Sequence, residues 1–237
     1  MEYSEIINQT WKKPEGSFDL YVSSHKEALS DFLSGNLVTD LIAKGQFSTR
    51  HYHSLLKTIF HQVYFSSTSF GLAGALISNK SVAARTYLLH HAEEEMNHWT
   101  WILDDLNSTG YRGVDPREEH PNWAAQSYLS YGVYLSVFNP IARLAMAQVL
   151  EGVSGEFGIK YGLKAIEQVK ITKDQAKFFL LHGELDQGHT QDIEDVLKSE
   201  KLSPSEWADL AHVAKTTSRL YKNLYNYAMT EGLDLLR

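Results

Sequence analysis

Two segments of the chain place the same kinds of potential metal ligand at the same spacing. In each, an acidic residue follows a histidine by four positions, and a second histidine follows the acid by three. The residues are His91, Glu95, His98, His182, Asp186 and His189. Positions i, i+4 and i+7 of an α-helix lie within about 60° of one face. Imidazoles and carboxylates together suit a first-row metal such as iron or manganese. Since the chain has only 11 histidines in 237 residues, two copies of this pattern are not expected by chance.

The second half of each pattern is an acid-x-x-His pair, Glu95 with His98 and Asp186 with His189. Carboxylate-bridged di-iron bundles take one such pair from each of two helices and a lone carboxylate from each of two others. Glu151 is a candidate for one lone carboxylate, because it follows a largely apolar run in which an ionised group needs a partner.

The other lone carboxylate is expected on the helix around residue 60, and that segment contains none. It offers His61 instead, and an imidazole binds one metal without bridging two. We therefore expect His61 to point into the same cavity as Glu95 and to act in catalysis. Tyr64, one turn further on, is a candidate aromatic side chain that could lose an electron.

The elements that must position these residues are all helical, because no segment alternates apolar and polar residues as a strand does. Expected helices cover residues 19–33, 37–44, 48–64 and beyond, 81–106 and 123–135. Three more begin at Asn139-Pro140, at Thr172 and at Ser203. The last two starts carry a capping box, with Gln175 and Glu206 in the third helical position. We expect an all-α fold, a single-domain bundle of seven to eight helices that covers residues 1–237.

Composition excludes several classes of protein. The formal net charge is −7 and no Lys/Arg cluster is present, which disfavours nucleic-acid binding. No apolar run is long enough for a membrane span, and the first residues do not have the form of a signal peptide. The chain has no cysteine, which excludes disulfides and thiolate ligands. We expect a cytoplasmic protein with no nucleic-acid or membrane partner.

Three segments resemble the heme-oxygenase-like superfamily, in the branch of TenA, PqqC, CADD and the di-iron oxidases and oxygenases. They are LLHHAEEEMNHW, AMAQVLEGVSGEFG and FFLLHGELDQGHTQDI, within a resemblance that spans roughly residues 45 to 200. The resemblance implies a heme-oxygenase-like bundle. It also implies that one set of residues corresponds to di-metal ligands: Glu95, His98, Glu151, His182, Asp186 and His189. His91 matches a ligand position used in CADD-like members.

The resemblance also has departures. Members with a full metal site place a glutamate near position 61 or 62, where this chain has His61-Gln62. TenA thiaminases use a cysteine nucleophile, so their activity is not implied for a chain without cysteine.

From these features we expect a metal-dependent oxidase or oxygenase that uses O2 to oxidise a small organic substrate. Two iron ions are the expected cofactor, with manganese or a single metal ion as alternatives. A cofactor-independent PqqC-like oxidase or a TenA-like small-molecule-binding protein is the alternative function. The sequence is compatible with a homodimer.

Overall fold

The computed structural model describes residues 15–236, apart from the side chains of residues 156, 157, 159 and 184–187. The described residues form α-helices and short 3₁₀ turns and contain no strand, which confirms the all-α prediction. The longer helices are α2 (Phe18–Leu33), α4 (Thr49–Leu76), α5 (Val82–Glu94), α6 (His98–Ser108), α7 (Trp123–Phe138), α8 (Ala142–Lys160), α10 (Lys177–Ser199) and α11 (Pro204–Ala228). The short ones are α3 (Leu37–Ala43), α9 (Gly162–Val169) and α12 (Glu231–Asp234).

The expected number of seven to eight helices is too low, for three local reasons. The helix expected over residues 81–106 is interrupted by the 3₁₀ turn η1 (Glu95–Asn97), which separates α5 from α6. The other two additions, α9 and α12, span eight and four residues. Segments that short do not repeat an apolar period often enough for the sequence to reveal them.

Both predicted capping boxes are present, but one begins an α-helix and the other begins a short 3₁₀ turn. At the first residue of α11 the prediction is confirmed, since Ser203 Oγ accepts a hydrogen bond from the Glu206 amide at 3.3 Å. At the other box, the Thr172 amide donates to Gln175 Oε1 at 3.0 Å, but the box opens only the 3₁₀ turn η3 (Lys173–Gln175). The long helix α10 begins at Lys177, after this turn has ended.

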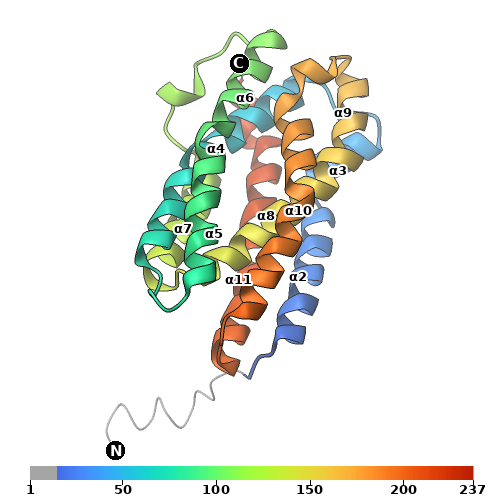
Figure 1. Ribbon diagram of the computed structural model, residues 1–237. Helices are drawn as coiled ribbons and strands as arrows, with labels where there is room; N and C mark the ends of the chain where they lie inside the picture. The colour runs from blue at the N-terminus through green and yellow to red at the C-terminus, as the bar shows by residue number, and fades with distance from the viewer. Residues whose placement is uncertain (1–14, 237) are drawn as a thin grey trace, which may run out of the picture.

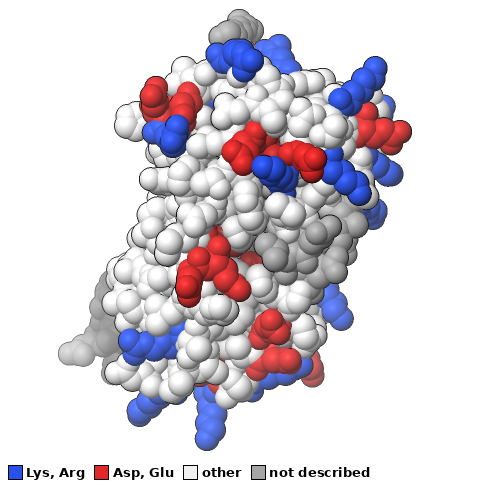
Figure 2. All heavy atoms as spheres, turned by 45° about the horizontal axis from the view of Figure 1, so that its top comes forward, with Lys and Arg blue, Asp and Glu red and all other residues white. Residues whose placement is uncertain are grey.

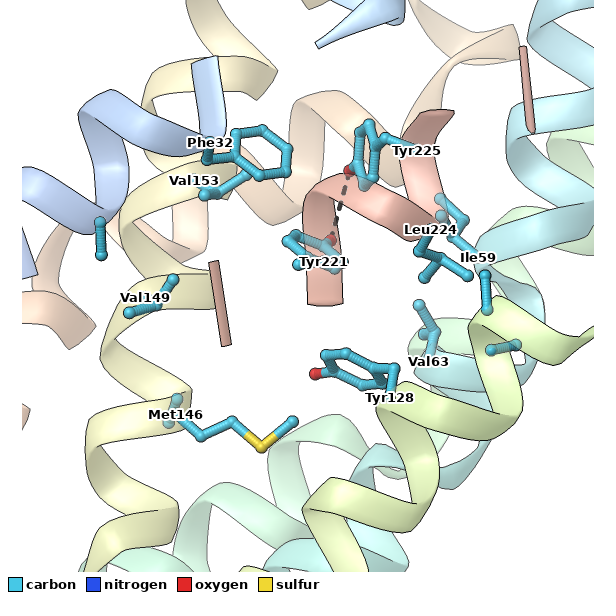
Figure 3. Close-up of a cluster of buried hydrophobic side chains, with 14 of the residues drawn as sticks. Phe32, Ile59, Val63, Tyr128, Met146, Val149, Val153, Tyr221, Leu224 and Tyr225 are labelled. Carbon is cyan, nitrogen blue, oxygen red and sulfur yellow. Dashed lines mark hydrogen bonds between the residues drawn. The ribbon is translucent and has the colours of Figure 1, made fainter. Parts of the chain in front are cut away.

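The helices pack so that α8 and α10 lie against each other in the middle of the molecule (Figure 1). Helix α11 runs along α2 and also contacts α8, α4 and α7, while α4 packs between α5 and α7. Apolar and aromatic side chains from α2, α4, α7, α8 and α11 meet inside this arrangement (Figure 3). Four neighbouring elements, α5, α6, α8 and α10, therefore face a common interior from different sides.

Two glycines allow α8 and α10 to cross at close range. A Cβ atom at Gly158 would lie 2.5 Å from the carbonyl oxygen of Phe179, a distance that real Cβ atoms do not adopt. On the other helix, a Cβ atom at Gly183 would lie 3.3 Å from the carbonyl oxygen of Ser154. Any larger residue at position 158 would push the helices apart, because the obstacle is backbone. The crossing brings the histidines of α10 next to the acidic residue of α8.

The first turn of α10 is held by a side chain from another helix. Asp105, on α6, accepts hydrogen bonds from the backbone amides of Lys177 at 2.9 Å and Phe178 at 3.0 Å. The hydroxyl of Tyr52 donates to the same carboxyl at 3.1 Å. Ala176, at the N-cap, has no side-chain oxygen to do this. Burial raises the pKa of Asp105 to about 6, although the amide and hydroxyl donors limit the rise.

Figure 2 shows lysine and arginine side chains spread over this face of the surface, several of them along its upper right edge, among acidic and uncharged residues. In the part of the chain that the structure describes, no helix has the length and apolar character needed to cross a membrane.

Replacing Asp105 by alanine should destabilise the fold, since it leaves the buried amide of Phe178 and the part-buried amide of Lys177 without an acceptor at the start of α10. We expect a loss of about 3 kcal/mol in the free energy of unfolding at pH 5, measured by urea denaturation. Asp104→Ala is the matched control: its exposed carboxylate forms an ion pair with Lys177 at 3.2 Å, and its loss should cost less than about 0.5 kcal/mol. Equal losses in the two variants would contradict the proposed role of Asp105.

The contribution of Asp105 should also depend on pH. Its pKa is about 6 in the folded protein, above the ordinary value of 3.8, so the folded protein binds this proton more tightly than the unfolded chain. Stability from this carboxyl is therefore fully present below pH 4 and is lost as the pH rises through 6. Between pH 5 and pH 7.5 the difference in unfolding free energy between wild type and Asp105→Ala should shrink by about 1 kcal/mol. A difference that grows with pH would show that the ionised form is the favoured one.

Candidate metal centre

The break between α5 and α6 determines where the first set of predicted ligands points. His91 lies on α5, Glu95 begins the 3₁₀ turn and His98 is the first residue of α6. A 3₁₀ turn advances the chain by about 120° per residue instead of 100°. The sequence suggested that the three side chains lie on one continuous helix face, and the 3₁₀ turn makes this expectation wrong. All three side chains are nevertheless buried and directed to the interior.

One group of ligand-type atoms forms around Glu95. Its Oε1 atom lies 3.1 Å from Nδ1 of His98 and 3.9 Å from Nε2 of His182. The two imidazole rings meet edge to face with their centroids 4.7 Å apart. This group, Glu95 with His98 and His182, is called triad A below.

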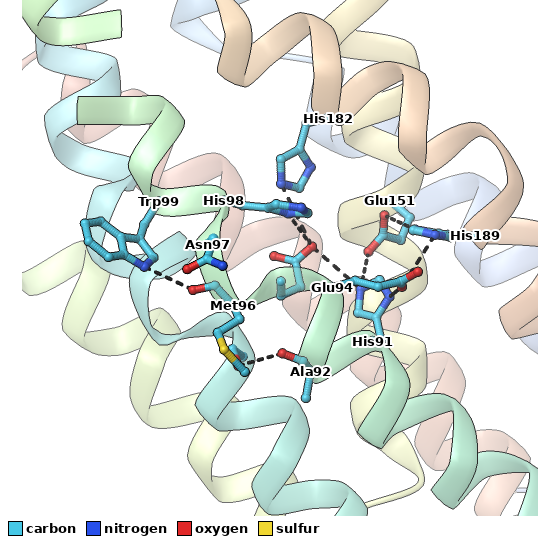
Figure 4. A network of polar contacts seen from close by, with 12 residues as sticks. His91, Ala92, Glu94, Met96, Asn97, His98, Trp99, Glu151, His182 and His189 are labelled. Carbon is cyan, nitrogen blue, oxygen red and sulfur yellow. Dashed lines mark hydrogen bonds and ion pairs between the residues drawn. The ribbon is translucent and has the colours of Figure 1, made fainter. Parts of the chain in front are cut away.

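A second group forms beside it, around Glu151. Oε1 of Glu151 lies 3.0 Å from Nε2 of His91, and Oε2 lies 3.5 Å from Nδ1 of His189. The imidazoles again meet edge to face, with centroids 5.0 Å apart. Figure 4 shows His91, Glu151 and His189 together on one side and His98 and His182 on the other. This second group is triad B.

The histidines have the same spacing in the two predicted segments, and this explains why each histidine of α5–α6 lies against one of α10. The two histidines on α5–α6 are seven positions apart in the sequence, and so are the two on α10. His91 meets His189 and His98 meets His182, so the two segments run in opposite directions and match at both ends. Each segment thus contributes one histidine to each triad.

Glu95 lies between the triads. The same Oε1 atom that hydrogen-bonds with His98 lies 3.8 Å from Nε2 of His91, in triad B. Burial alone would raise the pKa of Glu95, but the hydrogen bond with His98 and the positive charge that His182, His98 and His91 can carry outweigh it and lower the pKa to about 2. The carboxylate is therefore ionised at neutral pH and available to a cation on either side.

Two residues of triad B have buried polar atoms that the protein leaves without hydrogen bonds. Neither ring nitrogen of His91 makes one, although Nε2 lies so close to Glu151, and Oε2 of Glu151 also accepts none. A buried polar atom without a hydrogen bond costs about 1–3 kcal/mol.

The spacing of the ligand atoms is similar in the two triads. In each triad one atom per residue lies within 4.8 Å of the others. Atoms bound to one first-row metal at about 2.1 Å lie about 3–4 Å apart. Each triad is therefore compatible with metal binding, once its ligand atoms move slightly closer together.

A small cavity of about 30 Å³ adjoins both triads. Polar groups line it on the side of the triads, and the rest of its wall is apolar and aromatic. Its lining includes Gln62, Ser66, Phe178, Phe179, Tyr221 and Tyr225. The cavity holds about one water-sized group.

The structure corrects the placement of His61. This residue lines a different hollow, at the surface, where Lys57, Glu119 and His120 surround it. Its neighbour Gln62 lines the cavity beside Glu95 instead. On a helix, adjacent residues point about 100° apart, so only one of the two could face the centre, and the expectation that it would be His61 is wrong.

Tyr64 also lies away from the cavity. Its side chain is 53% exposed and stacks on Phe60, with centroids 5.6 Å apart, next to Trp99. A better-placed aromatic residue is Trp101, whose ring stacks on His98 at a centroid distance of 4.3 Å. The side chain of Asp186 lies outside the described residues, so its predicted role as a ligand stays a prediction.

Comparison with known proteins identifies the family. A model of the iron-containing redox enzyme family matches residues 55–222. The match covers more than half of the chain, so the protein belongs to this family. No curated protein shows a significant match.

Solved structures share the fold at low sequence identity. A domain of unknown function with a heme oxygenase-like fold from Shewanella denitrificans has a TM-score of 0.77 and 20% identity, covering 88% of this chain and 90% of that one. A TenA homologue from Pseudomonas syringae has a TM-score of 0.74 and 13% identity, with 91% and 93% covered. A CADD-like protein of unknown function from Nostoc punctiforme has a TM-score of 0.68 and 16% identity, with 90% and 98% covered. The fold is therefore heme oxygenase-like, as the resemblance implied.

The placement of Gln62 and His61 can be tested by introducing a carboxylate at each position. Gln62→Glu would bury a further negative charge beside Glu95 and Glu151, so metal-free protein should lose at least about 2 kcal/mol of unfolding free energy at pH 7.5. His61→Glu places the same charge in a half-buried surface hollow near Lys57 and should cost less than about 1 kcal/mol. A larger loss for His61→Glu would mean that His61 faces the centre.

Proposed function

We propose that the protein is a metal-dependent oxidase or oxygenase that holds two iron ions and uses O2 to oxidise a small organic substrate. The observation that carries this proposal is the pair of buried triads, each with one carboxylate and two imidazoles, on either side of Glu95. Such a ligand set suits iron and leaves coordination positions open. Membership of the iron-containing redox enzyme family supports the same class of chemistry.

Each described residue of the centre has a definite part in this proposal. Glu95, His98 and His182 would hold one ion, and His91, Glu151 and His189 the other, with Glu95 able to contact both. Iron in these positions would supply the binding and reduction of O2 and the oxidation of the substrate. Trp101 packs on His98 and so fixes the plane of that ring, which sets the direction of the ring nitrogen that faces Glu95.

The cavity determines what can reach the centre. Its volume of about 30 Å³ accepts O2 without rearrangement, whereas an organic substrate requires side chains of the wall to move. The aromatic part of the wall, with Phe178 and Tyr221, favours an apolar substrate body and keeps water away.

Gln62, a neutral residue, would take the position at the centre where a carboxylate ligand was expected on α4. Its side chain is buried, and its carbonyl oxygen Oε1 accepts no hydrogen bond. An amide oxygen can coordinate a metal but adds no negative charge and does not bridge as a carboxylate does. The same feature favours the alternative function, a cofactor-independent oxidase in which the histidines act as acids and bases on an organic ligand.

Metal content should distinguish the two triads. Protein reconstituted anaerobically with ferrous iron should contain two ions per chain, and His98→Ala and His189→Ala should each lower the number to about one, because they remove ligands from different triads. His90→Ala is the matched control, since His90 is exposed on α5 and belongs to neither triad; its Nε2 lies 3.4 Å from Oε1 of Glu94. A loss of iron in His90→Ala equal to that in His98→Ala would contradict the assignment.

Oxygen consumption separates the proposed function from its alternative. Iron-loaded protein with a chemical reductant should consume O2 at a rate that falls at least tenfold after removal of the metal with a chelator. The His98→Ala/His189→Ala double variant should behave like the metal-free protein. Consumption that is unchanged by the chelator would support the cofactor-independent alternative and overturn the metal-dependent one.

A further inference from the structure

A buried arginine close to the centre has no ionic partner in the part of the chain that the structure describes. Arg143 lies on α8, two turns before Glu151, and its residue surface is only 2% exposed. Its Nε donates a hydrogen bond to the hydroxyl of Ser69 at 2.9 Å, and its guanidinium carbon lies 3.7 Å from the centroid of the Phe70 ring. The Nη1 atom makes no hydrogen bond at all.

These contacts do not neutralise the charge. A hydroxyl and an aromatic ring attract a guanidinium, but neither carries a compensating negative charge. Burial lowers the pKa of Arg143, while Tyr128 and the more distant carboxylates of Glu95 and Glu151 oppose that shift. Arginine does not lose its proton in proteins, so the interior keeps an unpaired cation with an unused N–H group.

The space beside Arg143 adjoins the centre. Arg143 lines a hollow of about 10 Å³ whose wall includes Tyr128, Ser69, Gln62 and Ser66. The last two residues also line the cavity next to the triads, so they form a shared wall between the two spaces. Tyr128 reaches toward α8 from α7, as Figure 3 shows.

The lining of this hollow suits an anion. Hydroxyl, amide and guanidinium groups supply hydrogen-bond donors, and no acidic residue takes part in the wall. The net charge of the centre with two metal ions bound would also favour an anion. Glu94 also lies near the centre, with Oε2 3.4 Å from Nδ1 of His91 and 3.8 Å from Nε2 of His189. Two divalent ions and Arg143 together still carry more positive charge than the carboxylates of Glu94, Glu95 and Glu151 balance, so an added anion would be stabilised there.

We propose that Arg143 is the anion-binding group of this centre and receives the carboxylate of a small organic acid, with Tyr128 and Gln62 beside it. This inference rests on the proposed function for the oxidation itself, but the binding of the anion can be tested without it. A carboxylate fits better than a phosphate, because the planar guanidinium matches its two oxygens. The hollow of about 10 Å³ must widen to admit either anion, and the carboxylate, being planar and smaller, needs less movement of the wall. The apolar part of the acid would then extend along the aromatic wall of the larger cavity.

The test uses trifluoroacetate, a compact carboxylate, observed by fluorine NMR with metal-free and with iron-loaded protein. Trifluoroacetamide, the neutral analogue, is the ligand control. We expect saturable broadening of the trifluoroacetate signal by both forms of the wild-type protein, and at least tenfold weaker binding by Arg143→Met. Trifluoroacetamide should bind neither protein. Arg85→Met, which removes a half-buried arginine of α5 that does not line the hollow, should bind trifluoroacetate as the wild type does.

Two results would overturn the proposal: no saturable binding of trifluoroacetate by the wild type, or equal binding by wild type and Arg143→Met. If Arg143→Met does not fold, crystals of the wild type soaked in bromodifluoroacetate give an independent answer. A bromine anomalous peak in the hollow beside Arg143 supports the site, and its absence from that hollow excludes it.

Iron content measured on the same samples separates this inference from the proposed function. Anion binding by a protein that takes up no iron would leave the Arg143 site standing and remove the metal-dependent function. Iron uptake without anion binding would leave the metal-dependent function standing and remove the Arg143 site.

Discussion

The structure depends on keeping two carboxylates and four imidazoles in the interior of a helical bundle. Isolated, these groups would be costly to bury, and the protein offsets that cost by placing Glu151 of α8 against His91 of α5, and Glu95 against His98 three residues further along its own segment. The arrangement requires α10 to approach α8 closely and to start at a fixed point. Gly158 allows the approach, and Asp105 holds the first turn of α10.

The charges of Glu95 and Arg143, together with the neutral Gln62, determine the net charge of the interior around the triads. The pKa of Glu95 is lowered to about 2, so this carboxylate stays ionised among groups that can all accept or carry positive charge. Gln62 is a neutral residue in the wall beside the triads, and Arg143 adds a buried cation nearby. Both features make the interior less negative than a site built from carboxylates alone. This would favour a metal pair that works together with an organic anion.

Much of this could be predicted from the sequence, because helical periodicity and ligand spacing are local properties. The histidine and acid patterns identified His91, Glu95, His98, His182 and His189, and the apolar run before Glu151 singled it out; the structure brings these side chains together. The choice between His61 and Gln62 depended on the rotation of α4 about its axis, which neighbouring helices set. Arg143 carried the same signal as Glu151, a charge within an apolar run, whereas the cap by Asp105 depends on a contact between distant segments.

The central claim is that two metal ions lie between α5–α6, α8 and α10, and anomalous X-ray diffraction at the iron edge tests it most directly. Crystals grown anaerobically with ferrous iron should show two peaks about 3.5–4 Å apart, one within bonding distance of His98 and His182 and the other of His91 and His189. The absence of iron from both triads, or a peak bound elsewhere on the chain, would contradict the account.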